Sequence, residues 1–328
     1  MRLLTVNRNI SRTLLFFLLC GLSLLYLGVE PALAEKDSLI NPLRKYVKFR
    51  EIRSFRDKVE TLIDRKKEEG LAKEVAVYFR CLSDGIWFGI KERDKFAPAS
   101  LMKVPVMIAY FKEAENDPKI LEKKIQYEDL TDTADLFVKP KSMLKPGQYY
   151  TADKLIKAMI VDSDNNAFLI LTKNIDTATL AGTYINMGIL QTFREEGDFI
   201  SLKATVGMFR VLYNASYLNE KMSEKALRYL SAVSYKGGIP AGLPKDVVVA
   251  HKFGERIRPE ENTKQIHDVG IIYYGDSPYL LGIMTRGDDF RKLENVIRDI
   301  SALVYHEVDN QYKTRDGKIY PINADEPD

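Results

Sequence analysis

One stretch decides the fold of this chain: residues 100–111 read Ser-Leu-Met-Lys-Val-Pro-Val-Met-Ile-Ala-Tyr-Phe. The apolar run from Val104 predicts a helix, and Pro105 is tolerated because proline fits the first turn of a helix. Residues three apart on a helix share a face, with Cβ atoms about 5–6 Å apart. The side chain of Lys103 can therefore reach the hydroxyl of Ser100. A lysine that loses its proton on burial can activate such a serine as a nucleophile.

The same Ser-x-x-Lys spacing occurs a second time, at Ser142 and Lys145, in a different setting. Lys139-Pro140-Lys141 precedes it and Pro146-Gly147 follows it. A proline directly after Lys145 disfavours a helix, so the two side chains would not be stacked. We interpret this second copy as a solvated surface loop.

Two further motifs accompany the first copy: Ser163-Asp164-Asn165 and Lys252-Phe253-Gly254. Together with Ser100 and Lys103 they suggest a mechanism. Ser100 attacks a carbonyl carbon and Lys103 takes the serine proton. Ser163 can relay a proton, while Lys252 supplies positive charge beside it. The amide of Asn165 can donate to a substrate carbonyl.

The strand around Gly254 and the backbone around Ser100 offer the remaining groups that such chemistry needs. Backbone N–H groups near Ser100 and just after Gly254 can hold an oxyanion, a contribution of about 2.7–4 kcal/mol per donor in another hydrolase. Glycine lets a substrate lie close to the edge of a strand. A helix-capping turn is the simpler reading of residues 162–166, and a strand-end cation is the simpler reading of Lys252. A calcium loop is excluded, because Ala167 and Lys173 stand where glycine and glutamate are required.

The three motifs in this order are the signature of class A β-lactamases and penicillin-binding proteins. From about residue 45 to about residue 308 the sequence resembles this superfamily of serine β-lactamases and D,D-peptidases. The resemblance implies that Ser100 is acylated and that Lys103 is a general base or a relay. It implies that Ser163 passes a proton to the leaving nitrogen and that Asn165 orients the substrate.

The resemblance also assigns the binding groups. It implies that Lys252 and the residue after it bind a substrate carboxylate. The backbone N–H groups of Ser100 and Glu255 would form the oxyanion hole, with Gly254 beside them. No cofactor is implied.

Two departures from the family pattern bear on function. Phe253 replaces the usual Thr or Ser, so a hydroxyl that would grip the substrate carboxylate is missing, and Arg286 or Arg256 is a candidate to compensate. The family's Glu-x-x-Leu-Asn pattern, whose glutamate activates the deacylating water, is absent from the short interval 189–199. Glu195 and Glu196 are candidates by composition alone. We therefore expect fast acylation and slow deacylation.

Strand patterns lie near both ends of the chain and helix patterns lie between them. Strands are expected at 75–82, 85–90, 247–250, 269–274 and 279–285, with the third ending at His251-Lys252. Helices are expected at 52–69, from 104 to about 230 with interruptions, and from 290 to 304. We predict an α/β (α+β) fold, in which N- and C-terminal parts form one antiparallel sheet flanked by helices. The resemblance implies the same architecture.

The predicted domains follow from this pattern. Residues 45–100 and 244–308 form the sheet domain, residues 101–243 form an inserted all-α domain, and residues 309–328 form a polar tail. The first 34 residues are basic, then apolar over 14–29, then end in Ala32-Leu33-Ala34. This order predicts a signal peptide or an N-terminal anchor, and hence an exported protein with possible membrane attachment through residues 14–29.

Charge and cysteine content exclude several classes of function. The whole chain has a formal net charge of +3, and the basic start accounts for most of it. This near balance argues against nucleic acid as a partner. Cys81 is the one cysteine after residue 34, and the three histidines form no ligand-spaced pair, so we expect neither a disulfide nor a metal.

The sequence leaves three functions open. The first is an exported β-lactamase-like serine hydrolase acting on β-lactams or related acyl-D-alanyl amides. The second is a D,D-peptidase acting on cell-wall peptides through the same acylation step. The third is a catalytically weak relative that binds peptidoglycan or a partner protein. We expect a monomer in each case.

Overall fold

The computed structural model describes residues 49–131, 136–189, 197–275 and 277–312. The chain divides into two units, residues 1–47 and 48–328, and every described element belongs to the second. The predicted export segment 1–34 lies outside the described residues, as do residues 313–328 of the predicted tail. No helix among the described residues is long and apolar enough to span a bilayer.

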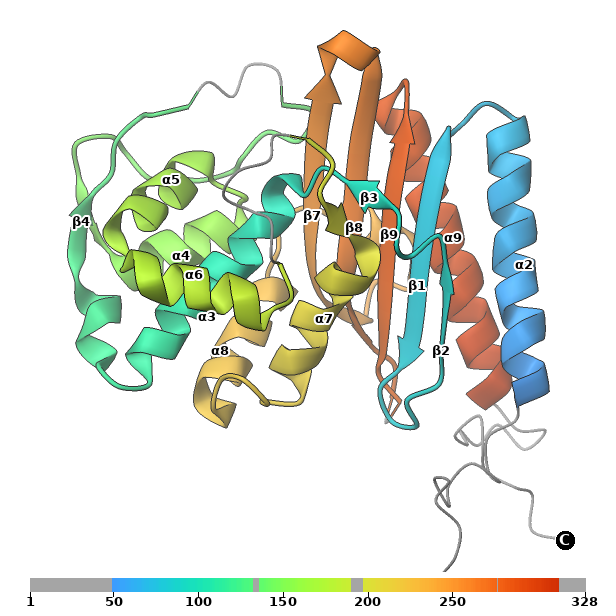
Figure 1. The fold of residues 1–328 in the computed structure, drawn as a ribbon, viewed down its shortest axis with the longest axis horizontal. Coiled ribbons are helices and arrows are strands. Elements are labelled where there is room, and N and C mark those ends of the chain that lie inside the picture. Colours follow the sequence, from blue (N-terminus) through green and yellow to red (C-terminus); the bar gives the residue numbers. More distant parts are fainter. Residues whose placement is uncertain (1–48, 132–135, 190–196, 276, 313–328) are drawn as a thin grey trace, which may run out of the picture. The chain divides into compact units, whose positions relative to one another are not determined.

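A five-stranded antiparallel sheet forms the centre of the fold, in the order β2-β1-β9-β8-β7 (Figure 1). Its strands are β1 (Glu74–Cys81), β2 (Trp87–Ile90), β7 (Val248–Arg258), β8 (Thr263–Tyr273) and β9 (Tyr279–Gly287). The register places Glu74 opposite Arg286, so strands from the N-terminal and C-terminal parts of the described chain join in one sheet. This confirms the predicted fold class.

The central strands are buried along nearly their whole length, which means that both faces of the sheet are covered. Helices α2 (Phe49–Glu68) and α9 (Phe290–Tyr312) lie on one face, where the short helix η4 (Ile239–Gly242) packs against α9, and helices α3 to α8 lie on the opposite side (Figure 1). Ion pairs of 2.8 Å between Lys58 and Glu307 and of 2.7 Å between Lys66 and Asp299 join α2 to α9. On the opposite face, a Cβ added to Gly282 of β9 would lie 2.6 Å from Leu202 of α7, so glycine permits close helix–sheet packing.

The helical side begins directly after the sheet's first hairpin. Its helices are η2 (Ala99–Met102), α3 (Lys103–Ala114), η3 (Pro118–Glu122), α4 (Ala152–Val161), α5 (Asn165–Asn174), α6 (Thr177–Asn186), α7 (Leu202–Tyr213) and α8 (Glu220–Ser231). Short pairs β3 (Lys95–Phe96) with β6 (Ile200–Ser201) and β4 (Lys124–Gln126) with β5 (Tyr149–Thr151) connect them, and η5 (Pro259–Glu261) links β7 to β8.

Polar caps explain where these helices start. Helices α4 to α8 each begin after a residue whose side chain accepts from a backbone N–H of the first turn, namely Thr151, Asp164, Asp176, Ser201 and Asn219. Each such cap contributes about 1 kcal/mol. The loop that holds Ser142 and Lys145 is neither helix nor strand, and Met143 within it is 89% exposed.

Several predicted boundaries are wrong. The strand expected at 269–274 begins earlier, at Thr263. The strand expected to end at His251-Lys252 continues to Arg258, because β7 pairs along its full length with β8. Helix α9 continues to Tyr312, past the expected start of the polar tail, and Tyr274 donates a 2.7 Å hydrogen bond to Asp309 in this last part. Residues 48–328 form one unit, which contains both the predicted sheet domain and the predicted helical domain. The boundaries between these domains therefore stay a prediction.

Candidate active site

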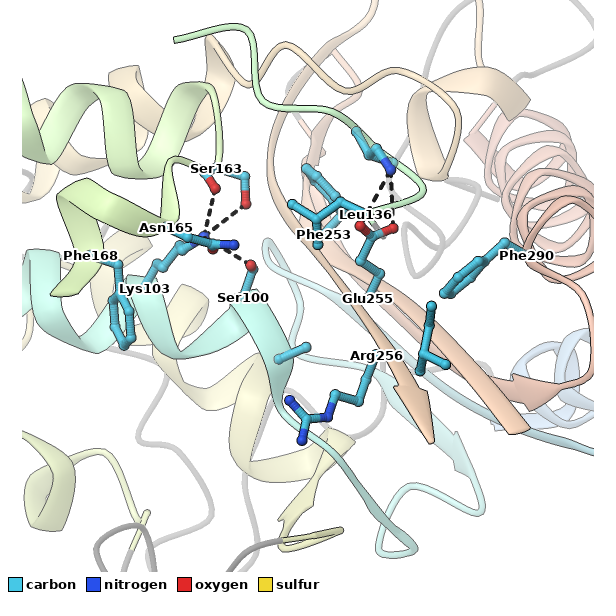
Figure 2. A pocket seen from close by; sticks show the side chains of 13 residues that line it. Ser100, Lys103, Leu136, Ser163, Asn165, Phe168, Phe253, Glu255, Arg256 and Phe290 are labelled. Atoms are coloured by element: carbon cyan, nitrogen blue, oxygen red, sulfur yellow. Dashed lines mark hydrogen bonds between the residues drawn. The ribbon is translucent and has the colours of Figure 1, made fainter. Parts of the chain in front are cut away.

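Ser100 lies in the short helix η2, and Lys103 is the first residue of α3. The Nζ of Lys103 lies 3.0 Å from the Oγ of Ser100. Ser100 is partly exposed and lines an open cavity of about 420 Å³, whereas Lys103 is 2% exposed (Figure 2). Ala99, directly before Ser100, has a φ of +47°, which strains a residue other than glycine. The nucleophile candidate therefore sits on a tightly determined turn.

The Nζ of Lys103 is surrounded by four oxygens. It lies 2.7 Å from the backbone O of Ser163, 2.6 Å from the Oδ1 of Asn165, and 3.0 and 3.1 Å from the Oγ atoms of Ser100 and Ser163. The backbone O and the amide O can only accept, so they take two N–H groups. The other two oxygens belong to hydroxyls, which can donate. A neutral amine fits this cage, with its lone pair directed at a serine hydroxyl.

In the turn at residues 163–166, alternate side chains point either toward the cavity or into the surrounding structure. Ser163 has a φ of +57°, and its backbone O and Oγ both face Lys103. Asp164 caps α5 and accepts a 2.8 Å hydrogen bond from Tyr127, and Asn166 accepts one of 2.8 Å from the N–H of Leu130. The capping interpretation of this turn thus holds for Asp164. Ser163 and Asn165 face the cavity (Figure 2).

Lys252 reaches the same cluster from strand β7. Its Nζ donates to the Oγ of Ser163 at 2.9 Å and to the backbone O of Phe253 at 3.1 Å, and it lies 4.3 Å from the centre of the Phe253 ring. Lys252 is completely buried and does not line the cavity. The ring of Phe253 packs against this amine, and the expected contact between Lys252 and a substrate carboxylate stays a prediction.

Burial dominates the electrostatics of both lysines. Desolvation, and then the charge of Lys252, hold the pKa of Lys103 well below its usual value. Burial likewise lowers the pKa of Lys252 to about 7, against the opposing charges of Asp268 and Glu255. A buried cluster with Ser163 Oγ between two amines disfavours two simultaneous positive charges. Lys103 is thus suited to accept a proton from Ser100.

Strand β7 passes very close to the nucleophile at Gly254. A Cβ placed there would lie 3.1 Å from the backbone N of Ser100, 3.2 Å from Pro98 O and 3.3 Å from Ala99 Cβ. These distances are shorter than ordinary Cβ contacts, and two of the neighbours are backbone atoms, which cannot rotate away, so glycine suits this position. The predicted place of Gly254 beside Ser100 agrees with this geometry.

The backbone before Ser100 is anchored by two buried residues of β8 that the sequence analysis did not single out. Gln265 accepts a 3.0 Å hydrogen bond from the N–H of Ala97. His267 Nδ1 accepts from the N–H of Thr285 at 3.2 Å, so its Nε2 carries the hydrogen and donates to Ala97 O at 3.1 Å. Burial lowers the pKa of His267 to about 4, which keeps the ring neutral. Gln265 and His267 lie 168 and 170 positions along the chain from Ala97. Single buried residues so far from their partner give no local pattern in the sequence.

Glu255 enters the site by its side chain, not only by the backbone N–H that was predicted. Its carboxylate lines the cavity and accepts from the N–H of Val138 at 3.2 and 3.3 Å (Figure 2). Burial is the main cause that raises its pKa to about 7, while the two loop N–H groups, Lys139 and Lys103 oppose the rise. The site therefore contains a carboxyl group that titrates near neutral pH.

The two arginines proposed to compensate for Phe253 behave differently. Arg286 is engaged with Asp198, with Glu74 at 2.7 Å and with Lys95 O at 3.2 Å, and it does not line the cavity. The interpretation of Arg286 is therefore wrong. Arg256 does line the cavity. Glu195 and Glu196 lie outside the described residues.

Comparisons with known proteins identify a family and a shared fold. The sequence model of the β-lactamase enzyme family matches residues 54–308. No curated protein sequence matches the chain significantly. A mutant of PBP-A, solved as its acyl-enzyme complex with penicillin G, is 20% identical with a TM-score of 0.65, and the match covers 79% of this chain and 97% of that one.

Two β-lactamase structures are similar to the same extent. One, from Chitinophaga pinensis, is 20% identical with a TM-score of 0.66 and coverage of 77% and 98%. The class A β-lactamase of the last common ancestor of Gram-negative bacteria is 21% identical with a TM-score of 0.64 and coverage of 76% and 98%. At such identities these structures establish the shared fold alone. The family match over residues 54–308 goes further, and this chain belongs to the β-lactamase enzyme family.

Proposed function

We propose that this protein is an exported serine acyl hydrolase that forms an acyl-enzyme at Ser100 with β-lactams or related acyl-D-alanyl amides. The observation that carries the proposal is the 3.0 Å contact between Ser100 Oγ and the buried amine of Lys103, at the wall of an open cavity. The basic, then apolar sequence of residues 1–34 supports export.

The acylation step uses groups already in contact. Ser100 Oγ forms a bond to the carbonyl carbon while its proton passes to Lys103 Nζ. In this proposal the N–H groups of Ser100 and Glu255 hold the oxyanion, and the close approach of Gly254 to the backbone N of Ser100 supports this role. The carbon–nitrogen bond then breaks, and the leaving nitrogen takes a proton through Ser163 Oγ. Ser163 can pass this proton because its Oγ lies 3.1 Å from Lys103 Nζ.

Within the described part of the site, no glutamate of a Glu-x-x-Leu-Asn pattern is available as the base for deacylation. Among the described residues that line the cavity, Glu255 is the one carboxylate, and the N–H of Val138 donates to its two oxygens. The loss of one general base costs about 10²–10⁴ in rate. We therefore propose that the acyl-enzyme accumulates.

Intact mass after mixing with penicillin G tests this proposal. We expect a 1:1 adduct that forms quickly, persists, and is absent from Ser100→Ala. The loop serine Ser142, in the second Ser-x-x-Lys copy, provides the matched control, because Ser142→Ala should be acylated like the wild type. Turnover of penicillin without any adduct would refute slow deacylation, and no reaction at all would refute acyl transfer.

A D,D-peptidase is the second candidate, favoured by the absence of the Glu-x-x-Leu-Asn pattern from residues 189–199. It uses the same acylation step, so the substrate separates the two functions. Release of D-alanine from a cell-wall peptide, with a persistent penicillin adduct, would identify the peptidase. A cellular role that survives in Ser100→Ala would instead favour a binding protein.

A further inference from the structure

Strand β7 runs past the nucleophile and gives the reaction cavity two distinct ends. At one end, the Nζ of Lys252 lies 2.9 Å from the Oγ of Ser163, the group proposed to protonate the leaving nitrogen. Gly254 is the point where the strand approaches the backbone N of Ser100. Arg256 lies two residues further on, which is about 7 Å along a strand. In the proposed acylation the leaving group therefore points toward Ser163, and the acyl group points toward Arg256.

The guanidinium of Arg256 is a permanent positive charge at this acyl end, because arginine does not lose its proton in proteins. Arg256 is exposed and lines the cavity (Figure 2). Within the described part of the chain, it has no hydrogen-bond or ion-pair partner. Two other arginines of the sheet are paired, Arg258 with Asp198 at 2.9 Å and Arg286 with Glu74 at 2.7 Å. The guanidinium of Arg256 is therefore available to a ligand.

The other ionisable groups of the cavity wall offset this charge only in part. Lys103 is held by four oxygens, and burial favours its neutral form. The carboxyl group of Glu255 faces the loop at Val138, whose N–H donates to it at 3.2 and 3.3 Å, and the guanidinium of Arg256 points away from it (Figure 2). The pKa of Glu255 is raised to about 7, so this group is partly protonated at neutral pH. The acyl end thus keeps a positive charge.

Apolar side chains make up most of the wall around the guanidinium. They are Leu136, Val138, Phe168, Phe253, Ile257 and Phe290. Apolar walls strengthen a charge contact, because they displace water that would screen it. A guanidinium also binds a carboxylate through two parallel N–H groups, which fixes the orientation of the ligand. The chemistry that fits this end of the cavity is therefore a carboxylate on an otherwise apolar acyl group.

We propose that Arg256 binds a carboxylate on the acyl side chain of the substrate, and thereby favours acyl donors that are anionic on this side of the reacting carbonyl. The inference rests on the acyl transfer proposed for Ser100 and names a substrate class within it. This carboxylate is a different one from the carboxylate on the leaving side, for which Lys252 stays the predicted contact.

Three penicillins that differ only on the acyl side chain test the assignment. Penicillin G has no charge there, carbenicillin adds a carboxylate, and ampicillin adds an amino group at the same carbon. All three keep the ring carboxylate on the leaving side. The second-order rate of acylation is measured by intact mass at pH 7 for the wild type, Arg256→Gln and Arg256→Lys. Lys145→Gln is the matched control, because it removes one positive charge from an exposed loop residue outside the cavity.

The decisive quantity is the rate with carbenicillin divided by the rate with penicillin G. In Arg256→Gln this ratio should fall about tenfold from its wild-type value, the effect of one lost charge contact. Arg256→Lys should show a smaller fall, and Lys145→Gln should show none. The ratio of ampicillin to penicillin G should not fall in any variant. Intrinsic reactivity cancels, because each ratio is compared between proteins.

Two results would overturn the inference. An unchanged ratio of carbenicillin to penicillin G in Arg256→Gln would show that no acyl-side carboxylate is bound, even if all three rates fell together. Equal falls in Arg256→Gln and Lys145→Gln would show an effect of net charge without a contact.

Equilibrium binding of carbenicillin to Ser100→Ala, with and without Arg256→Gln, separates this inference from the proposed function. If the wild type forms no adduct but Arg256→Gln weakens binding about tenfold, acyl transfer fails and the carboxylate site stands. If adducts form with unchanged ratios, the carboxylate site fails and acyl transfer stands. No adduct together with equal binding rejects both.

Discussion

Ser163 Oγ lies 2.9 Å from the Nζ of Lys252 and thereby connects this buried lysine to the nucleophile's base. The connection is electrostatic as well as geometric, since the charge of Lys252 lowers the pKa of Lys103. In the proposed mechanism Lys252 therefore acts through Lys103 and Ser163, because it does not line the cavity itself.

Replacing Lys252 by methionine should raise the pKa of Lys103, because a neighbouring positive charge is removed. The acid limb of the acylation rate would then move to higher pH. Lys252→Arg keeps the charge and should show no such upward shift. The measurement is the rate of penicillin adduct formation between pH 5 and 10. A shift of the same size and direction in both variants would contradict this account.

The left-handed backbone at Ser163 allows the role of its hydroxyl in acylation to be tested apart from the effect of its backbone conformation on stability. Ser163→Gly and Ser163→Ala both remove the hydroxyl, and we expect both to slow acylation by about a hundredfold or more, as for a lost proton relay. Glycine adopts a φ of +57° freely, whereas alanine does not. The glycine variant should therefore be more stable than the alanine variant by about 1 kcal/mol in urea unfolding. Equal stability would argue against strain at this position.

The close approach at Gly254 predicts a specific effect of one added methyl group. In Gly254→Ala the new Cβ would push on Ser100 N and Pro98 O, so acylation should fall sharply and stability by about 1–3 kcal/mol. Gly182 in α6 is the matched control, because nothing lies within 4 Å of a Cβ added there. Gly182→Ala should leave acylation unchanged and should stabilise the helix by up to about 1 kcal/mol.

His267 predicts a stability change with pH. Its pKa falls from 6.5 in the unfolded chain to about 4 in the folded protein, so the unfolded state binds more protons in this window. Stability from this group therefore decreases as the pH falls from 6.5 to 4, by about 1.4 kcal/mol per unit. Glu255, whose pKa is raised, contributes with the opposite sign.

A difference measurement isolates the histidine. The free energy of unfolding is compared between the wild type and His267→Gln at several pH values, so that the Glu255 contribution cancels. We expect the wild type to lose stability relative to the variant on acidification. A difference that does not change with pH would show that His267 is not buried in its neutral form.

Local patterns predicted some parts of the site, and tertiary register decided the others. Ser100 and Lys103 were predictable because three-residue spacing on a helical turn brings them together. Strand β7 was expected to stop at Lys252, since its polar second half resembles a loop, and only pairing with β8 extends it to Arg258. The same register turns the side chain of Glu255 into the cavity. His267 and Gln265 reach the nucleophile's backbone across the sheet, a relationship that no sequence period encodes.

Hydrogen bonds from Thr285 through His267 to Ala97 hold the backbone before Ser100. The serine and its base are therefore held by different parts of the fold. The position of Ser100 is fixed by the middle of the sheet, whereas oxygens from the turn between α4 and α5 surround the Nζ of Lys103. A partial opening that frees only the helices would leave the alcohol in place and dismantle the amine's cage. The protein would then lose its acylation activity before it unfolds globally. Reactivity toward penicillin would therefore report whether the helical side is intact.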